Sequence, residues 1–152
     1  MQYWLIKSEP RELSIDDLAE TPLRTTHWDG VRNYQARNMM RDEMKKGDLA
    51  FFYHSNCAQP GIVGIIKVTR ERYPDFTAFD PNDPRYDANS DPDHSRWYML
   101  DVKLVRKLDR TIGLGELNTH IELSGLPLLR RGNRLSVMPV SRAQWDFILA
   151  LQ

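Results

Sequence analysis

The chain has 152 residues, of which 41% are hydrophobic and 28% are charged, a balance that predicts one globular domain spanning residues 1–152. The same balance argues against a disordered chain, and no apolar run approaches the roughly 20 residues that a membrane-spanning helix needs. The 21 basic and 21 acidic side chains cancel, so net charge gives no general attraction to a polyanion. A single cysteine and the lack of a secretory signal pattern predict a cytoplasmic protein.

The charges are unevenly distributed along the chain. Residues 74–93 carry six aspartates opposed only by Arg85, together with four prolines, which predicts a long acidic surface loop without regular structure. Basic residues form three other groups: Arg32, Arg37 and Arg41; Lys103, Arg106, Lys107 and Arg110; and Arg130, Arg131 and Arg134. These groups allow contact with nucleic acid on one face, and ordinary solvated charges are the equally simple alternative.

The residue pattern of the first part of the chain predicts one strand and two helices. Residues 2–7, QYWLIK, are aromatic and β-branched and stop before Pro10, which predicts a strand. Ser14 offers a side-chain oxygen to the turn that follows it, so a short helix is expected to begin there. Residues 33–46 have helix-forming composition and end in two lysines before a glycine, which predicts a second helix.

The later part of the chain is mostly strand-forming. Two glycines, Gly61 and Gly64, flank one apolar run and indicate a bulge or a close approach of another segment. Residues 114–120 suit a short helical turn, and Ser141 with Gln144 in the reciprocal capping position predicts a final helix. Four runs are the predicted strands: 49–54, 62–70, 97–108 and 135–141.

This order of elements indicates the fold class. About five strands with short helices between them, and no regular βαβ alternation, favour an α+β fold built on a mostly antiparallel β-barrel with flanking helices. Many small barrels share this inventory, so periodicity alone does not identify which barrel it is.

The residues offer little catalytic or metal chemistry. The four histidines are dispersed, and one cysteine cannot form a thiolate metal site. The strongest nucleophile candidate is Cys57, three residues after His54, with Asp29 as a carboxylate. Alternatively, Cys57 is a plain loop residue and His54 a hydrogen-bonded strand end. We therefore expect no catalytic residue, no cofactor and no metal.

Several motifs follow one another along nearly the whole chain: KSEP at 7–10, HWDGVRNYQARNMM at 27–40, FYHS at 52–55, GIVG at 61–64, RWYMLDV at 96–102 and LLRRGNRLSVMPV at 128–140. Their order and spacing closely resemble the EVE domain, a family grouped with the YTH and PUA folds. The resemblance implies a PUA-like pseudobarrel with a pocket for a single base, and a nucleic-acid partner that is modified DNA or RNA. Modified cytosines in DNA and methylated RNA bases are the ligands it implies.

A pocket that reads a base needs flat side chains. A base that leaves its stack regains roughly 1–3 kcal/mol by packing on an aromatic ring. Given the resemblance, Trp28 and Trp97 are the predicted stacking residues, and Tyr53 and His54 are predicted to add a ring or an edge contact. Either tryptophan, and Tyr53, could instead be a core residue.

Reading a base also needs hydrogen bonds to its edge. Asn33 is the predicted edge reader, since an amide both donates and accepts, and Ser8 is predicted to bond an exocyclic group. Four cations are the predicted phosphate contacts: Lys7, Arg32, Arg130 and Arg131. The alternative roles are a helix N-cap for Asn33, a turn for Ser8 and solvated surface charge for these four cations.

The sequence therefore favours a non-catalytic module that recognises a modified base. One alternative is a general PUA-type RNA-binding protein. A second is an enzyme acting on modified nucleotides through His54 or Cys57 with Asp29. A third is a protein-interaction scaffold that uses the acidic loop at 74–93.

Overall fold

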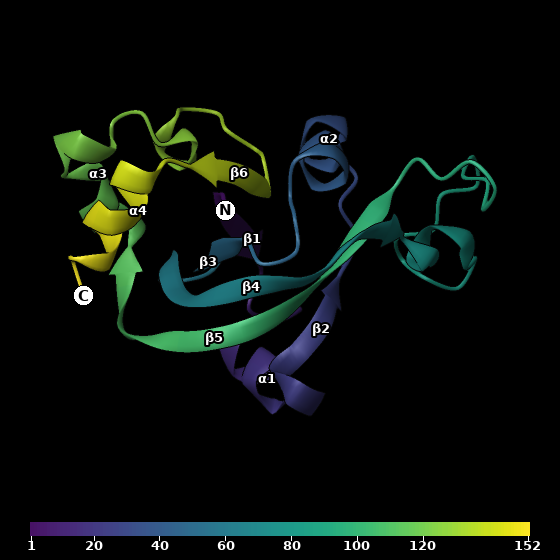
Figure 1. Cartoon of the computed structure of the whole chain (residues 1–152), viewed down its shortest axis with the longest axis horizontal. Coiled ribbons are helices and arrows are strands. Elements are labelled where there is room, and N and C mark those ends of the chain that lie inside the picture. The colour runs from purple at the N-terminus through teal and green to yellow at the C-terminus, as the bar shows by residue number, and fades with distance from the viewer.

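The computed structural model describes residues 1–152 and is built around one six-stranded sheet (Figure 1). The strands lie in the order β2–β5–β4–β3–β1–β6; β1 and β3 are parallel, and every other neighbouring pair is antiparallel. None of the helices is long and apolar enough to span a bilayer. The strands are β1 (Tyr3–Ser8), β2 (Thr25–Trp28), β3 (Leu49–His54), β4 (Gly61–Pro74), β5 (Tyr98–Gly113) and β6 (Val137–Val140). The α-helices are α1 (Ile15–Glu20), α2 (Tyr34–Asp42), α3 (Leu114–Asn118) and α4 (Arg142–Leu149).

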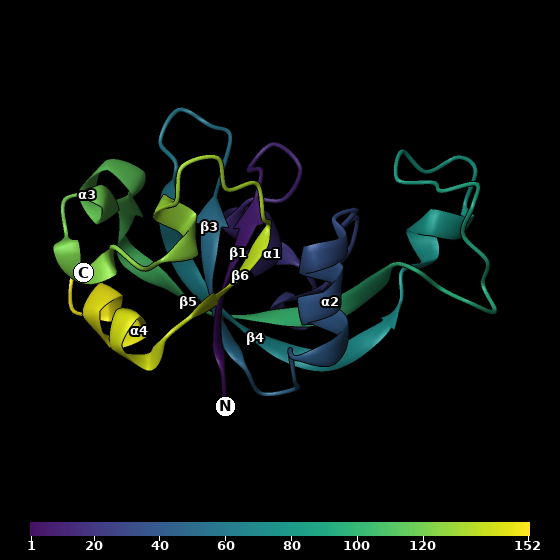
Figure 2. The ribbon, with the colours of Figure 1, turned by 90° about the horizontal axis from the view of Figure 1, so that it is seen from above.

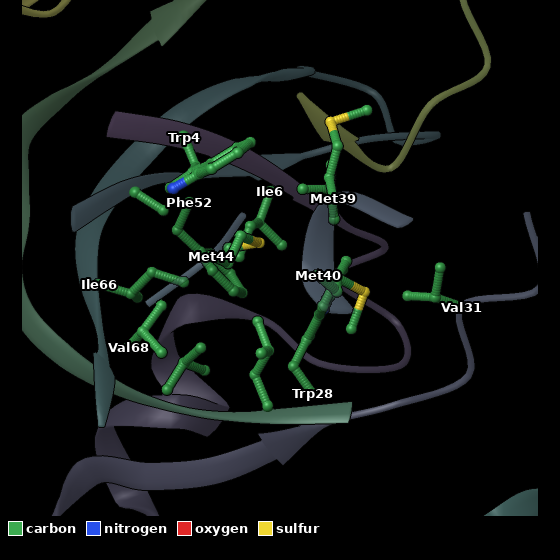
Figure 3. Close-up of a cluster of buried hydrophobic side chains, with 14 of the residues drawn as sticks. Trp4, Ile6, Trp28, Val31, Met39, Met40, Met44, Phe52, Ile66 and Val68 are labelled. Atoms are coloured by element: carbon green, nitrogen blue, oxygen red, sulfur yellow. The ribbon is translucent and has the colours of Figure 1, made fainter. Parts of the chain in front are cut away.

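The predicted α+β class and the mostly antiparallel strand pairing are confirmed, and the sheet stays open instead of closing into a full barrel. Its edges are β2 and β6, which are four residues long each and do not pair with one another. Helix α2 contacts β4, β5 and β6, and its Ala36, Met39 and Met40 are buried in the core between them (Figure 3). A helix thus fills the space that strand pairing would close in a barrel.

Apolar side chains cover both faces of the sheet. Because successive residues of a strand point to opposite faces, Trp4 and Ile6 of β1 join one core cluster while Leu5 joins the other. The first cluster includes residues of α1 and α2 and lies inside the curve of the sheet (Figure 3). The second packs against α3 and α4, which lie together at one end of the molecule (Figure 1). The sheet is therefore held rigidly from both sides.

The three predicted helix starts are confirmed by their caps. Ser14 and Asp17 form a reciprocal capping box at α1, and Ser141 with Gln144 forms another at α4. At α2 the Asn33 side-chain oxygen accepts the backbone N–H of Ala36 at 2.9 Å. These local bonds explain why the helices begin where the sequence indicates.

Helix α2 ends at Asp42, four residues before the predicted end at residue 46. The buried carboxylate of Asp48 accepts the N–H of Lys45 at 3.0 Å and the indole N–H of Trp4 at 3.0 Å. These bonds turn the chain, and Met44 enters the core without any exposed surface. Trp4 is a long-range partner of Asp48 that local composition cannot reveal, and this contact explains the shorter helix.

The acidic loop connects β4 to β5 and stands beyond α2 at the end of the molecule opposite α3 and α4 (Figure 2). Most of it is turns and irregular chain, as predicted, and one 3₁₀ helix spans Phe76–Phe79. Gly64 of β4 lies under α1, because a Cβ there would be 2.1 Å from Ile15 Cδ1. The expected close approach at this glycine is thus confirmed.

Candidate functional site

A hollow of about 810 Å³ opens where β1, β2 and β3 end. Its walls also come from the chain after β1, the chain after β2, the chain before β6 and the acidic loop. Leu13, Trp28 and Val31 are the apolar residues of the lining. The other lining residues are Lys7, Ser8, Glu9, Glu12, Thr26, His27, Asp29, Gly30, Arg32, Ser55, Pro84, Arg85, Arg134 and Ser136.

The end of β1 organises one side of this hollow. The N–H of Lys7 donates to the carbonyl of Ser136 at 2.8 Å, and the N–H of Ser55 donates to the carbonyl of Ser8 at 3.0 Å. The Ser8 hydroxyl donates to the carbonyl of Leu13 at 2.7 Å, which closes the turn after β1. Ser8 therefore has the turn role that the sequence left open, and its oxygen still has capacity to accept a hydrogen bond.

Trp28 is the last residue of β2, and it lines the hollow where the hollow meets the first core cluster. Its side chain belongs to the first core cluster, and the residue is only 7% exposed (Figure 3). The tryptophan thus offers a small, fixed part of its ring to the hollow. A ligand there would pack against an apolar surface already held in place by the core.

The chain after β2 is fixed by a buried carboxylate at the start of the acidic loop. Asp75 has no exposed side-chain surface and accepts hydrogen bonds from the N–H of Gly30 at 2.8 Å and from Arg32 Nη1 at 3.0 Å. Burial raises the pKa of Asp75, but hydrogen bonds from Thr77, Gly30 and Arg32 outweigh it, and the net pKa lies below its ordinary value. Asp75 therefore stays ionised and ties the loop to the hollow.

The guanidinium of Arg32 makes all its hydrogen bonds within this same contact. It donates to Asp75, to Thr77 Oγ1, to the carbonyl of Val31 and twice to the carbonyl of Arg85, at 2.8–3.3 Å. These five bonds match the five N–H donors of an arginine side chain. The predicted phosphate contact of Arg32 is not supported by this geometry, because no donor is left over.

Arg85 of the acidic loop and Asp29 of the chain after β2 lie side by side in the wall of the hollow. Arg85 Nη2 lies 3.3 Å from Glu12 Oε2, and Arg85 Nε lies 3.9 Å from Asp29 Oδ1. His27 Nε2 lies 3.1 Å from Asp29 Oδ2. Burial, and then the nearby charge of Asp75, raise the pKa of Asp29. Asp29 is thus a partly desolvated acceptor at the edge of the hollow.

Gly30 lets the loop approach closely. It has a φ of 77°, in the left-handed region, and a Cβ built on it would lie 1.9 Å from Arg85 Nε. Any other residue would displace the Arg85 side chain from this wall. The glycine therefore couples the chain after β2 to the acidic loop.

Two cations of the hollow have no ion-pair partner. The Lys7 ammonium and the Arg134 guanidinium make no hydrogen bond or salt bridge, whereas Arg32 and Arg85 are both engaged. Burial lowers the pKa of Lys7. A bound anionic group would offset that desolvation cost.

Trp97 does not line the hollow, so the structure does not bring the two predicted tryptophans together in its wall. Its indole N–H donates to Asp87 Oδ2 at 2.8 Å, and its ring stacks on Tyr34 with centroids 4.8 Å apart. The guanidinium carbon of Arg32 lies 5.4 Å from the Trp97 ring centroid. Trp97 therefore positions Arg32 and the acidic loop from behind the wall.

Three further predicted base contacts also lie outside the lining. Asn33 is exposed and caps α2, which is the structural alternative that the sequence left open. Tyr53 is 2% exposed within the second core cluster, and burial raises its pKa to about 12. His54 Nε2 accepts the N–H of Ile15 at 3.1 Å, and burial lowers its pKa. These residues hold the framework of the hollow.

The enzyme alternative draws little support from this arrangement. His54 Nε2 already accepts a backbone N–H, so that nitrogen is not free to activate Cys57, which is exposed. Asp29 lies in the hollow, and His54 does not line it. No group of three or more histidine, cysteine, aspartate or glutamate side chains could hold a metal ion.

Arg130 and Arg131 are exposed on the segment before β6, and neither lines the hollow. Their predicted phosphate contact stays a prediction. The sequence reasoning did not assign Arg134 to the site, although it lies in the motif at 128–140 and lines the hollow. It also missed Arg85, whose only signal was its place as the lone cation of the acidic loop.

Comparison with known proteins identifies the family. The family model described as the EVE domain matches residues 2–151. The chain belongs to the EVE domain family. Rat thymocyte nuclear protein 1 is 48% identical over 167 residues, which cover 99% of this chain and 73% of that protein.

Solved structures of this EVE domain family have the same α+β, PUA-like fold. A crystal structure from Pseudomonas putida is 52% identical, with a TM-score of 0.94, and the alignment covers 98% of both chains. Human thymocyte nuclear protein 1 (THYN1) in complex with DNA containing 5-methylcytosine is 45% identical, with a TM-score of 0.92. That alignment covers 99% of this chain and 97% of the human one.

Proposed function

We propose that this EVE domain binds nucleic acid without catalysis and reads a modified base, such as 5-methylcytosine, in the hollow at the ends of β1, β2 and β3. The observation that carries the proposal is the human relative, whose structure in complex with DNA containing 5-methylcytosine has the same fold over nearly the whole crystallised chain. The polar hollow of this chain, with one tryptophan in its wall, fits a flat ligand that has hydrogen-bonding edges.

The residues of the hollow suit a cytosine. In the proposal, the exposed part of Trp28 packs against the base, and the Asp29 carboxylate accepts a hydrogen bond from the exocyclic amino group of the cytosine. The Ser8 oxygen accepts a further hydrogen bond. Lys7 and Arg134, which have no ion-pair partner, neutralise adjacent phosphates, with Arg130 and Arg131 further out on the same segment.

Binding of duplexes that differ by one methyl group tests the base preference. Burying a methyl group is worth about 0.8 kcal/mol, so the 5-methylcytosine duplex should bind about fourfold more tightly than its cytosine counterpart in fluorescence anisotropy. Methylated RNA oligonucleotides of matched length complete the panel and address the general RNA-binding alternative. Equal affinity for every modified and unmodified member would contradict the proposal.

Turnover separates a reader from an enzyme. Incubation of the protein with the same oligonucleotides and with modified nucleosides should leave them unchanged by mass spectrometry. A new product that disappears in His54→Ala would establish the enzymatic alternative.

A further inference from the structure

A second hollow of about 810 Å³ lies on the sheet and shares no lining residue with the first. It sits where β2 and β3 begin, next to the middle parts of β4 and β5, so it lies toward the other end of β2 and β3. No carboxylate lines it. Four cations do: Arg24, Lys46, Lys67 and Lys103. We call this second hollow the basic groove.

The charges of the basic groove are not neutralised within the protein. None of its four cations has a salt bridge, whereas eight of the other seventeen lysines and arginines pair with a carboxylate. Glu71 lies nearby and accepts the backbone N–H of Lys46, but it does not line the groove. The whole chain has equal numbers of acidic and basic side chains, so this local excess is not a consequence of overall charge.

Strand pairing places two of these charges directly against one another. Lys67 of β4 and Lys103 of β5 are Cα partners in an antiparallel pair, and both are exposed. Like charges in directly opposite positions destabilise a sheet. An anionic ligand would attract both ammonium groups and so offset the repulsion between them.

Arg24 reaches the groove through an uncommon backbone conformation. Leu23 and Arg24 have φ values of 54° and 52°, in the left-handed region that side chains other than glycine rarely adopt. Leu23 is 85% exposed beside the groove. The chain thus accepts local strain at the residue that supplies the fourth cation.

We propose that the basic groove binds the sugar–phosphate backbone of a nucleic acid, giving the protein a contact that is independent of base identity. The inference rests on the proposed function for the choice of polyanion, and on charge complementarity for the contact itself. Lysine ammonium groups on flexible stems suit phosphate oxygens as point charges. The groove supplies the general affinity that the neutral molecule as a whole lacks.

The test compares Lys67→Gln/Lys103→Gln with a matched control, Arg41→Gln/Lys107→Gln. The control removes the same charge from the half-buried Arg41 and the exposed Lys107, which pair with Asp42 and Asp16 outside both hollows. The groove variant should weaken binding of modified and unmodified duplexes equally, by about tenfold at low salt, and reduce the slope of log K against log salt by about two. Its melting temperature should equal or exceed that of the wild type, because the repulsion is gone.

Each outcome separates the groove from the base pocket. Unchanged affinity in the groove variant, or an equal loss in the control, would overturn the basic groove while a preference for the methylated duplex still stood. No preference in the wild type, with a loss confined to the groove variant, would uphold the groove and overturn base reading. A wild type that binds neither duplex would overturn both.

Discussion

Asn33 shows how one side chain can be assigned to structure or to recognition by experiment. Its oxygen caps α2, so Asn33→Ala should lower the free energy of unfolding by about 1 kcal/mol in urea titrations. Asn33→Ser should restore most of that stability, since serine also caps helices. Because Asn33 does not line the hollow, the preference for a methylated duplex should be the same in both variants. A folded Asn33→Ser protein without that preference would assign the amide to base reading instead.

Asp75 is the residue on which the acidic loop depends most. Asp75→Ala should lower the free energy of unfolding by about 3 kcal/mol at pH 7, because it leaves Arg32 and the N–H groups of Gly30 and Thr77 without their acceptor. Asp93→Ala, at an exposed acid of the same loop, should stay within about 0.5 kcal/mol of the wild type.

The pH dependence follows from the lowered pKa of Asp75. A carboxyl whose folded-state pKa is depressed adds stability above its unfolded pKa of about 3.9 and loses it as the pH falls through the folded value. The difference between wild type and Asp75→Ala should therefore shrink below about pH 4. A difference that stays constant down to pH 2 would contradict the ionised buried carboxylate.

At the scale of elements, the acidic loop and the chain after β2 behave as one unit. Gly30→Ala places a Cβ where Arg85 Nε lies, and it strains a backbone with a φ of 77°. We expect this variant to lose about 1 kcal/mol or more of stability and to bind nucleic acid more weakly. In Gly30→Ala/Arg85→Ala the steric part of the cost should vanish, which a double-mutant cycle measures. Simple additivity of the two single variants would show that the loop does not press on Gly30.

The elements that sequence could predict are those whose signals are local. Ser14 and Ser141 mark helix starts because their capping partners lie three residues away. Strand β2 was missed because its four residues, TTHW, have no alternating pattern long enough to recognise. Its stability comes from pairing with β5, far away in the chain. The open sheet was likewise unpredictable, because it depends on how α2 packs between β6 and the β4–β5 pair.

Four of the predicted site residues line the hollow, and all four lie in the motifs at 7–10 and 27–40. Lys7, Ser8 and Trp28 lie at the ends of β1 and β2, and Arg32 lies in the chain after β2. Tyr53 faces the second core because it alternates with Phe52, a direction that depends on which face of β3 covers which cluster. Trp97 is turned away by its bonds to the acidic loop, which the sequence does not reveal.

At the scale of the whole molecule, our proposals assign base recognition to one hollow and backbone contact to the other. The pocket at the strand ends has one tryptophan, three carboxylates and two cations without ion-pair partners, whereas the basic groove has cations and no carboxylate. A neutral protein with this distribution would rely on local fields for affinity and on the pocket for selectivity. Residues 75–97 connect β4 to β5 at one end of the molecule (Figure 2). Arg85 of this connection lines the pocket.

The indole N–H resonances of the four tryptophans report directly on where the base lies. In a ¹H–¹⁵N NMR titration, the 5-methylcytosine duplex should shift the Trp28 resonance, because Trp28 lines the hollow, whereas Trp145, 3% exposed in the second core, should not move. Trp28→Phe and Trp145→Phe assign the two signals. The unmethylated duplex should shift Trp28 less at equal concentration. A Trp28 resonance that stays fixed while the methylated duplex binds would contradict base reading in this hollow.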